Sequence, residues 1–348
     1  MNSISEKIKL LRPLLIFLIV TTHIQGNLYR PDLKNLTLDW SSFFHSYLSG
    51  IIAISALPLL SVISGYLAAY TYRKYSYFQT LKDKINRILI PMLFWNLVLA
   101  LYIYNFQYNG IDFRKDLNLY PFNLETWFYA LTGIFRLPAN PPLYFLKELF
   151  TCFLLLPIFF NISNNKALTA LAITAIAYMS VNNINLGFLH RVDIYAFFLI
   201  GLFINNNNNN IRENYEKYFT KKIKTLYLIL FIILTSTLNL YAFKEENSNF
   251  IYYIKLITLV GPLAFWILSE HISGLLKCFL LWLSPISFSV FLGHILILNL
   301  YWSIWINNLK INPIKSHYWI YWLTSFILCY LLMGILNFIY KNLKNYKH

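Results

Sequence analysis

Two histidines within long apolar segments carry the side chains best suited to acid–base chemistry in this chain. His23 lies in KLLRPLLIFLIVTTHIQG, eleven residues after Arg12, and His294 lies in SPISFSVFLGHILIL. An imidazole takes up and releases protons near neutral pH, so each histidine is a candidate general base or transient acyl carrier. The alternative for each histidine is a structural hydrogen bond to a neighbouring helix.

The spacing of Arg12 and His23 predicts that both side chains share one face of a helix. Eleven steps of about 100° make nearly three turns, which separates the two residues by about 16 Å along the axis. Pro13 suits a first helical turn, so Arg12 is expected at the cytoplasmic mouth of a span and His23 near the bilayer midplane. Pro285 similarly begins the segment of His294, which is expected about 13 Å from the same side.

Other charged residues lie near the ends of apolar segments. Lys84 and Arg87 precede a proline in LKDKINRILIP, where they can orient the protein, bind anionic lipid or hold the phosphates of a donor. Glu148, Arg191 and Asp193 are expected near the outer side. These three residues either stabilise the bundle by charge pairing or line a polar vestibule for a hydroxylated substrate.

Several classes of site have no motif in this chain. We find no P-loop, dinucleotide fingerprint, H-E-x-x-H or G-x-S-x-G segment. The three cysteines have no paired spacing and lie in or beside apolar runs, so neither a disulfide framework nor a metal site is expected.

The composition is that of a membrane protein. Of 348 residues, 58% are hydrophobic and only 12% are charged, whereas soluble chains carry about 25% charged residues. The charge deficit falls in long uncharged runs, and about 20 apolar residues cross a hydrocarbon core of roughly 30 Å. These features exclude soluble Rossmann, barrel and sandwich folds.

The apolar windows predict an all-α, polytopic bundle of about ten transmembrane helices, embedded as one domain over residues 1–348 with no appended soluble domain. With the N-terminus inside, the inner segments hold 18 of the 29 Lys and Arg residues, which predicts cytoplasmic termini and a cytoplasmic (inner) membrane location. The net charge of +15 is therefore attributed to inner loops rather than to nucleic-acid binding. Segment 122–136 is expected to be an interfacial helix and Asn205–Asn210 a solvated linker. The ten predicted spans lie near residues 10–28, 46–71, 86–106, 142–161, 167–183, 187–204, 223–243, 250–269, 285–306 and 318–340.

These residues resemble the acyltransferase-3 family of integral membrane acyltransferases, which includes O-acetylases of cell-surface glycans. The most specific match is an Arg and a His separated by ten residues on the first span, here Arg12 and His23. The sequence departs from the family pattern at Lys84, where an Arg is usual, and at Tyr144, where a Trp is usual. The SGNH-type esterase domain that some family members carry after an extra span is not expected here. Supporting matches are SVISGYLAAY (61–70), KINRILIP (84–91), PLYFLKELF (142–150) and ISFSVFLGHILIL (286–298).

The resemblance implies acetyl-CoA as a cytoplasmic acyl donor and a surface glycan, or its lipid-linked precursor, as the acceptor. Arg12, helped by Lys84 and Arg87, would position the donor. His23 would act as general base or acyl carrier, with His294 polarising the thioester carbonyl or orienting His23. The residues that would engage the acceptor are Glu148, Arg191 and Asp193.

Two other functions remain open. A polytopic glycosyltransferase would use an acid in an outer loop, where Asp32 and Asp39 lie in a polar stretch that otherwise indicates solvated loop residues. A lipid-linked glycan flippase or transporter would need a continuous charged cavity, usually with repeat symmetry, and the sequence indicates neither.

Overall fold

The predicted all-α class is confirmed in the part of the chain that the structure describes. Every regular element there is a helix, and helices occupy all ten segments that the sequence predicts as spans. The chain folds into two compact units: unit 1 is Met1–Leu59 with Phe219–His348, and unit 2 is Leu60–Tyr218. The computed structural model describes residues 4–24, 40–111, 113–114, 116–182, 184, 187–244, 250–312 and 317–345.

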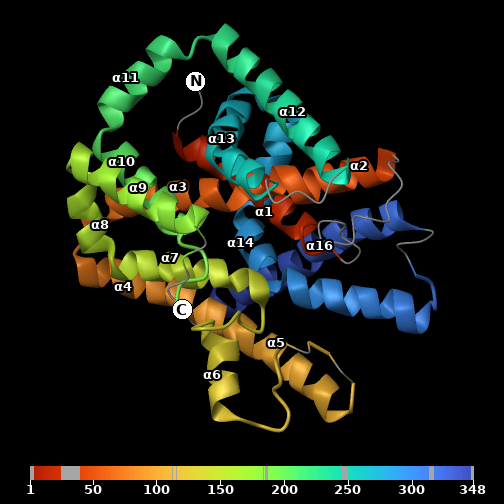
Figure 1. Ribbon diagram of the computed structural model, residues 1–348. Helices are drawn as coiled ribbons and strands as arrows, with labels where there is room; N and C mark the ends of the chain where they lie inside the picture. Colours follow the sequence, from red (N-terminus) through yellow and green to blue (C-terminus); the bar gives the residue numbers. More distant parts are fainter. Residues whose placement is uncertain are drawn as a thin grey trace. The chain divides into compact units, whose positions relative to one another are not determined.

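Unit 1 joins the start of the chain to its C-terminal third. α1 packs against α14, and α14 against α16, while α13 contacts α1, α12 and η3 (Figure 1). Its elements are α1 (Ile4–Thr21), α2 (Trp40–Ser46), the π-helical turn η2 (Tyr47–Ile51), the 3-10 turn η3 (Ile52–Ser55), α12 (Lys221–Lys244), α13 (Phe250–His271), α14 (Gly274–Ser303), the π-helical turn η6 (Ile304–Asn308) and α16 (Tyr318–Asn345).

Ion pairs gather four helix ends at one side of unit 1. Glu270, at the C-terminal end of α13, pairs with Lys7 of α1 at 2.7 Å and with Lys224 of α12 at 2.8 Å. Glu6 of α1 pairs with Lys277, near the start of α14, at 2.5 Å. The starts of α1, α12 and α14 therefore lie beside the end of α13.

The opposite side of unit 1 is marked by hydrogen bonds between the other helix ends. Tyr301, near the end of α14, bonds to Thr324, near the start of α16, at 2.7 Å. Ser46, at the end of α2, donates to Asn239, near the end of α12, at 2.8 Å. Because α16 runs antiparallel to α14, the first helix begins on the side where the last helix ends. That this side is cytoplasmic stays a prediction.

Unit 2 contains shorter helices, one pair of which is sharply bent. α7 and α8 meet at 70° across Leu155, and Pro157 in the first turn of α8 cannot donate the hydrogen bond that would continue α7. Its elements are most of α3 (Ala56–Lys74), α4 (Tyr77–Lys84), the π-helical turn η4 (Ile85–Leu89), α5 (Ile90–Tyr108), α6 (Leu124–Thr132), the 3-10 turn η5 (Pro141–Leu143), α7 (Tyr144–Leu154), α8 (Leu156–Ser163), α9 (Lys166–Val181), α10 (Asp193–Asn206) and α11 (Asn208–Tyr218).

Six helices in the described residues are long and apolar enough to cross a membrane, and the bent α7–α8 pair makes a seventh if it is one span. α9 and α10 are shorter apolar helices, and the first half of α1 carries four charged residues. A polytopic membrane protein is therefore confirmed, whereas the count of ten spans stays a prediction. The six helices are Phe43–Lys74, Tyr77–Tyr108, Lys221–Tyr241, Tyr253–His271, Gly274–Asn308 and Tyr318–Tyr340.

The predicted starts of the two histidine-bearing helices are wrong. α1 begins at Ile4 and α14 at Gly274, so Pro13 and Pro285 lie inside these helices. α1 extends further because its polar first turns carry the ion-paired Glu6 and Lys7. Membrane helices tolerate internal proline where neighbouring helices satisfy the freed backbone groups.

The segments predicted to be an interfacial helix and a solvated linker are both helical. α6 covers Leu124–Thr132 of the expected interfacial helix, with the Asn123 side chain accepting from the N–H of Thr126 at its start. The asparagine run was predicted to be a linker, and this is wrong: Asn205 and Asn206 end α10, and α11 begins at Asn208.

Candidate functional site

α1 carries Arg12 and places His23 just beyond its C-terminal end. The helix ends at Thr21, and a hydrogen bond of 3.0 Å from the His23 N–H to the Val20 carbonyl holds the following turn. The prediction that the helix continues through His23 is therefore wrong. The cause is local, because the hydroxyls of Thr21 and Thr22 bond back to helix carbonyls and compete with the backbone ladder.

The structure brings His23 and His294 together within unit 1. The centroids of the two imidazole rings lie 5.4 Å apart, and the ring planes are inclined at 44°. His294 is completely buried on α14, and His23 is only partly buried. The packing of α1 against α14 thus produces a histidine pair from residues 271 positions apart in the chain.

The hydrogen bonds of His294 define which ring nitrogen carries its proton. Nδ1 lies 2.9 Å from the carbonyl oxygen of Phe291 and 3.2 Å from that of Val290. Carbonyl oxygens only accept, so Nδ1 is assigned as the donor. Nε2 is buried and has no hydrogen-bond partner among the described residues. In the neutral ring this nitrogen therefore offers an unused lone pair.

Arg12 keeps an uncompensated charge below the histidine pair. Its side chain is exposed on α1, and no salt bridge joins it to any residue within the described ranges. Lys7, one and a half turns nearer the start of α1, is paired with Glu270. An exposed guanidinium without a carboxylate is suited to binding an anionic group such as a phosphate.

Lys84 and Arg87 belong to unit 2, and both already contact a carboxylate. Asp83 lies 2.6 Å from Nε of Arg87 and 3.3 Å from Nζ of Lys84. The Lys84 ammonium also lies 5.0 Å from the centroid of the Phe153 ring. Asp83 was not predicted as a partner of these cations, although it lies four residues before Arg87, the spacing of a helical ion pair. The role of these cations in donor binding stays a prediction.

The Glu148 side chain is fully buried and lies at the centre of a polar cluster in unit 2. Its carboxylate accepts from the backbone N–H of His190 at 2.8 Å and from the Tyr195 hydroxyl at 2.6 Å. The Lys147 ammonium lies 2.9 Å away and also donates to the Phe188 carbonyl at 2.6 Å. Both oxygens of Glu148 thus have donors within the unit, so the cluster ties α7 to the start of α10.

Arg191 and Asp193 form a bidentate pair next to this cluster. Nε and Nη2 of Arg191 lie 2.8 and 2.5 Å from the two Asp193 oxygens. Tyr195 was not among the residues predicted from the sequence, and its signal is a hydroxyl-bearing side chain in the first turn of a mostly apolar helix. The acceptor-binding role of Glu148, Arg191 and Asp193 stays a prediction.

α3 and α10 cross in direct backbone contact within unit 2. A Cβ placed on Gly65 would lie 2.0 Å from the Phe198 carbonyl oxygen, and one on Gly201 would lie 2.1 Å from the Val62 carbonyl oxygen. Only glycine fits at both positions, because a real side chain would push the helices apart. Gly65 belongs to the segment SVISGYLAAY, so this part of the motif has a structural cause.

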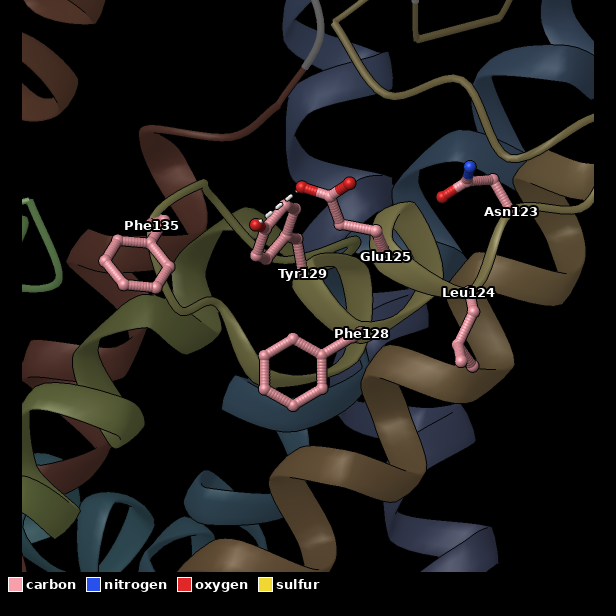
Figure 2. A pocket seen from close by; sticks show the side chains of 6 residues that line it. All are labelled: Asn123, Leu124, Glu125, Phe128, Tyr129 and Phe135. Carbon is pink, nitrogen blue, oxygen red and sulfur yellow. Dashed lines mark hydrogen bonds between the residues drawn. The ribbon is translucent and has the colours of Figure 1, made fainter.

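A cavity of about 600 Å³ lies against α6. Figure 2 shows Phe128, Phe135 and Leu124 on its walls, with the Glu125 carboxylate accepting from the Tyr129 hydroxyl at 2.7 Å. The hydrogen bond to Glu125 raises the pKa of Tyr129. None of the predicted catalytic residues lines this cavity. Its apolar walls fit the interfacial position predicted for this helix.

The described residues contain no group of three or more His, Cys, Asp or Glu side chains that could hold a metal ion. Cys152, Cys278 and Cys329 are free thiols.

Comparisons with known proteins agree with the resemblance stated above. The family model described as an acyltransferase domain, that of the acyltransferase-3 family, matches residues 5–338. The succinoglycan biosynthesis protein ExoH of Rhizobium meliloti (strain 1021) is 28% identical over 326 residues, which cover 87% of this chain and 81% of that protein. No solved structure matches the chain at a significant level.

Proposed function

The chain belongs to the acyltransferase-3 family, and we propose on this basis that it is a membrane O-acyltransferase that acetylates a polysaccharide. Acetyl-CoA is the proposed donor. The proposed acceptor is a hydroxyl of a cell-surface polysaccharide or of its lipid-linked precursor. The similarity to a succinoglycan biosynthesis protein supports an acceptor of this class. The observation that carries the proposal is the contact between His23 and His294.

In the proposed reaction His23 acts as the general base. The acceptor oxygen attacks the thioester carbonyl carbon while its proton passes to the His23 imidazole. The tetrahedral intermediate then expels the CoA thiolate, which takes the proton from His23 and leaves as a free thiol. The new bond is the ester between the acceptor oxygen and the acetyl group. In the variant with a transient acyl carrier, His23 itself holds the acetyl group between donor and acceptor.

His294 is proposed as the residue that orients His23. With its proton on Nδ1, a neutral His294 has no N–H at Nε2 and cannot donate a hydrogen bond to a thioester carbonyl. The same Nε2 can accept a hydrogen bond from the His23 ring and stabilise its protonated form. The tautomer therefore favours the orienting role over polarisation of the carbonyl.

Arg12 is proposed to bind a phosphate of the donor. Arg12 and His23 lie eleven positions apart, with ten residues between them. A helix of that length spans about 16 Å, which is of the order of the reach of an extended pantetheine arm, although α1 itself ends at Thr21. Lys84 and Arg87 are proposed to assist, although both contact Asp83. Glu148, Arg191 and Asp193 are proposed to face the acceptor. The membrane is proposed to be the cytoplasmic (inner) membrane, crossed about ten times with both termini cytoplasmic.

The proposal is tested by following labelled acetyl groups into the surface polysaccharide. His23→Ala and Arg12→Ala, each checked for normal membrane insertion, are expected to lose incorporation. Near-native acetylation in both variants would overturn the proposed mechanism.

The other candidate functions are separated by a second label. Purified protein is supplied either with labelled acetyl-CoA or with a labelled polyprenyl-linked sugar. Movement of the sugar label alone would indicate a glycosyltransferase, and movement of glycan between vesicles without either transfer would indicate a transporter. Asp32 and Asp39, the acids considered for glycosyl transfer, lie outside the described residues.

A further inference from the structure

A second cavity of about 600 Å³ lies in unit 2 and contains none of the residues assigned above. It is lined by Tyr66, Tyr70 and Arg73 of α3 and by the asparagine run Asn205–Asn210. The three α3 residues follow the spacing i, i+4, i+7, which places them on one face of the helix. The asparagine run, to which the sequence assigned no chemistry, forms the facing wall.

Arg73 is held in a fixed orientation at this cavity. Nη1 donates to the Asn205 side-chain oxygen at 2.9 Å, and Nη2 donates to that of Asn206. The guanidinium carbon also lies 5.7 Å from the centroid of the Phe160 ring. Two of the five N–H donors of the arginine are thus used, and three remain for a ligand.

The two asparagines are themselves fixed by their amide nitrogens. Asn205 Nδ2 donates to the Tyr66 carbonyl at 3.0 Å. Asn206 Nδ2 donates to the Ser163 hydroxyl at 2.6 Å and to the Asn164 side-chain oxygen at 2.8 Å. Both amide oxygens are therefore directed at Arg73 before any ligand arrives. Such preorganisation lowers the entropic cost of binding.

The charge of Arg73 is not balanced by a carboxylate. No salt bridge joins it to a described residue, and the cavity lining contains neither Asp nor Glu. Of the five other arginines of unit 2, only Arg136 likewise has no salt bridge to a described residue, and four differ in this respect. Each lies within salt-bridge distance of an acidic side chain: Arg87 with Asp83, Arg114 with Asp116, Arg191 with Asp193 and Arg212 with Glu216.

We propose that this cavity binds a phosphate monoester group, with Arg73 on the phosphate and Tyr66, Tyr70 and the asparagine amides around the remainder of the ligand. A guanidinium presents its donors in a fork that matches phosphate oxygens. Phenol rings and side-chain amides can stack on and hydrogen-bond to a nucleobase, which fits a nucleoside monophosphate. A phosphatidic acid headgroup has the same phosphate chemistry. The proposal does not depend on acyl transfer, because binding is measured without turnover.

The test uses the full-length protein in phosphatidylcholine nanodiscs, titrated with AMP and with adenosine. AMP is expected to bind, and adenosine is expected to bind at least about tenfold more weakly because it lacks the phosphate. A second titration, in nanodiscs that contain phosphatidic acid, distinguishes the lipid from the nucleotide. If phosphatidic acid competes with AMP for binding, the lipid headgroup occupies the same site. Failure of both AMP and phosphatidic acid to bind overturns the proposal.

Arg73→Gln assigns the binding to this cavity. It is expected to weaken AMP binding at least about tenfold, since it removes the charge-assisted hydrogen bonds. The matched control is Arg212→Gln on α11, because Arg212 is exposed, is paired with Glu216 and does not line the cavity. Equal AMP affinity in Arg73→Gln and the wild-type protein overturns the proposal. If Arg73→Gln fails to fold, AMP binding by Tyr70→Ala tests whether this cavity is the binding site.

The Tyr70 side chain is suited to this second variant because 62% of the residue is exposed, so its loss should leave the fold intact. Weaker AMP binding in Tyr70→Ala supports the cavity as the binding site. Unchanged AMP binding in that variant, with Arg73→Gln unfolded, removes the cavity from consideration.

Discussion

Each unit buries a cluster of titratable side chains, and the two clusters differ in what their hydrogen bonds leave unused. In unit 2 the Glu148 carboxylate receives donors from Lys147, His190 and Tyr195. In unit 1 the Nδ1 of His294 is bonded, but its Nε2 has no hydrogen-bond partner among the described residues. Both groups are fully buried.

This difference supports the proposed catalytic role of the histidine pair and a stabilising role for the Glu148 cluster. Buried polar atoms are almost always hydrogen-bonded, and the exceptions require an explanation such as catalysis. By this criterion Glu148 needs no further partner, because its own contacts satisfy both carboxylate oxygens. The Nε2 of His294 does need a partner, and the neighbouring His23 ring is a candidate. Residue type and burial alone would not have distinguished the two clusters.

The largest expected effect is on catalysis in unit 1. His23→Ala is expected to lower kcat/KM for acetyl transfer by about 10² to 10⁴, the usual contribution of a general base. The measurement is transfer of labelled acetyl by purified protein. His271→Ala is the control, because His271 also bonds through Nδ1 to a helix carbonyl but is exposed at the end of α13.

Two amide variants test whether His294 orients His23 or transfers a proton itself. His294→Gln places an acceptor near the Nε2 position, and His294→Asn retains only a donor near Nδ1. If His294 orients His23, the Gln variant is expected to retain more activity than the Asn variant. Equal and complete loss in both variants would instead favour proton transfer by His294 itself.

The next effect is on the stability of unit 2. Glu148→Gln is expected to lower the free energy of unfolding by about 3–5 kcal/mol, because it leaves the buried Lys147 ammonium without its carboxylate. Asp193→Asn is expected to have a smaller effect, since the Arg191 side chain is 39% exposed. SDS-induced unfolding of the purified protein measures both.

Activity measurements on the same variants test the predicted acceptor role. Loss of acceptor use with donor hydrolysis spared would assign Glu148 and Asp193 to the acceptor. Equal loss of both activities would leave them as structural pairs and would strengthen the contrast with the histidines.

A smaller effect is expected at the crossing of α3 and α10. Gly65→Ala is expected to destabilise the protein by about 1–3 kcal/mol, the usual range for overpacking, because its Cβ would overlap the Phe198 carbonyl. In Gly334→Ala the nearest heavy atom lies 3.6 Å away, an ordinary contact, so this variant serves as the control. Equal stability of the two variants would contradict the close contact. The melting temperature in detergent reports both.

The smallest expected effect is at the ion pairs of unit 1. Glu270→Gln removes a carboxylate that is shared by Lys7 and Lys224, but this side chain is 18% exposed rather than fully buried. Water therefore compensates part of the loss, and we expect about 1 kcal/mol. If Glu270→Gln lowered the free energy of unfolding as much as Glu148→Gln, the number of donors to a carboxylate, rather than its burial, would determine the size of the loss.

The sequence predicted the fold class and the helical segments, because long uncharged runs are a local signal. It also selected the two histidines, because polar residues are rare within such runs, and their catalytic role stays a prediction. It did not predict the helix starts at Ile4 and Gly274, since proline is normally a boundary and here is tolerated inside α1 and α14. The two histidines were expected at similar depth, where they could face one cavity and His294 could orient His23. That the two rings meet depends on which faces of the helices pack together.

Long-range contacts account for most of what the sequence analysis missed. The partnership of Tyr195 with Glu148, the glycine contact at Gly65 and the binding of Arg73 by Asn205 each join residues from different helices. No periodicity within one helix encodes such contacts. The asparagine run looked like a linker because its composition is polar, whereas its amides are used to hold an arginine.

Unit 1 is assembled from two distant segments of the chain, and this has a consequence for biosynthesis. Its two parts, Met1–Leu59 and Phe219–His348, are separated by the whole of unit 2. A ribosome inserting this chain into the membrane must release α14 before His23 can meet His294, so no shorter nascent product contains the pair. On the proposed mechanism, acyl transfer therefore requires synthesis of the chain through His294, and products that end before α14 are expected to be inactive.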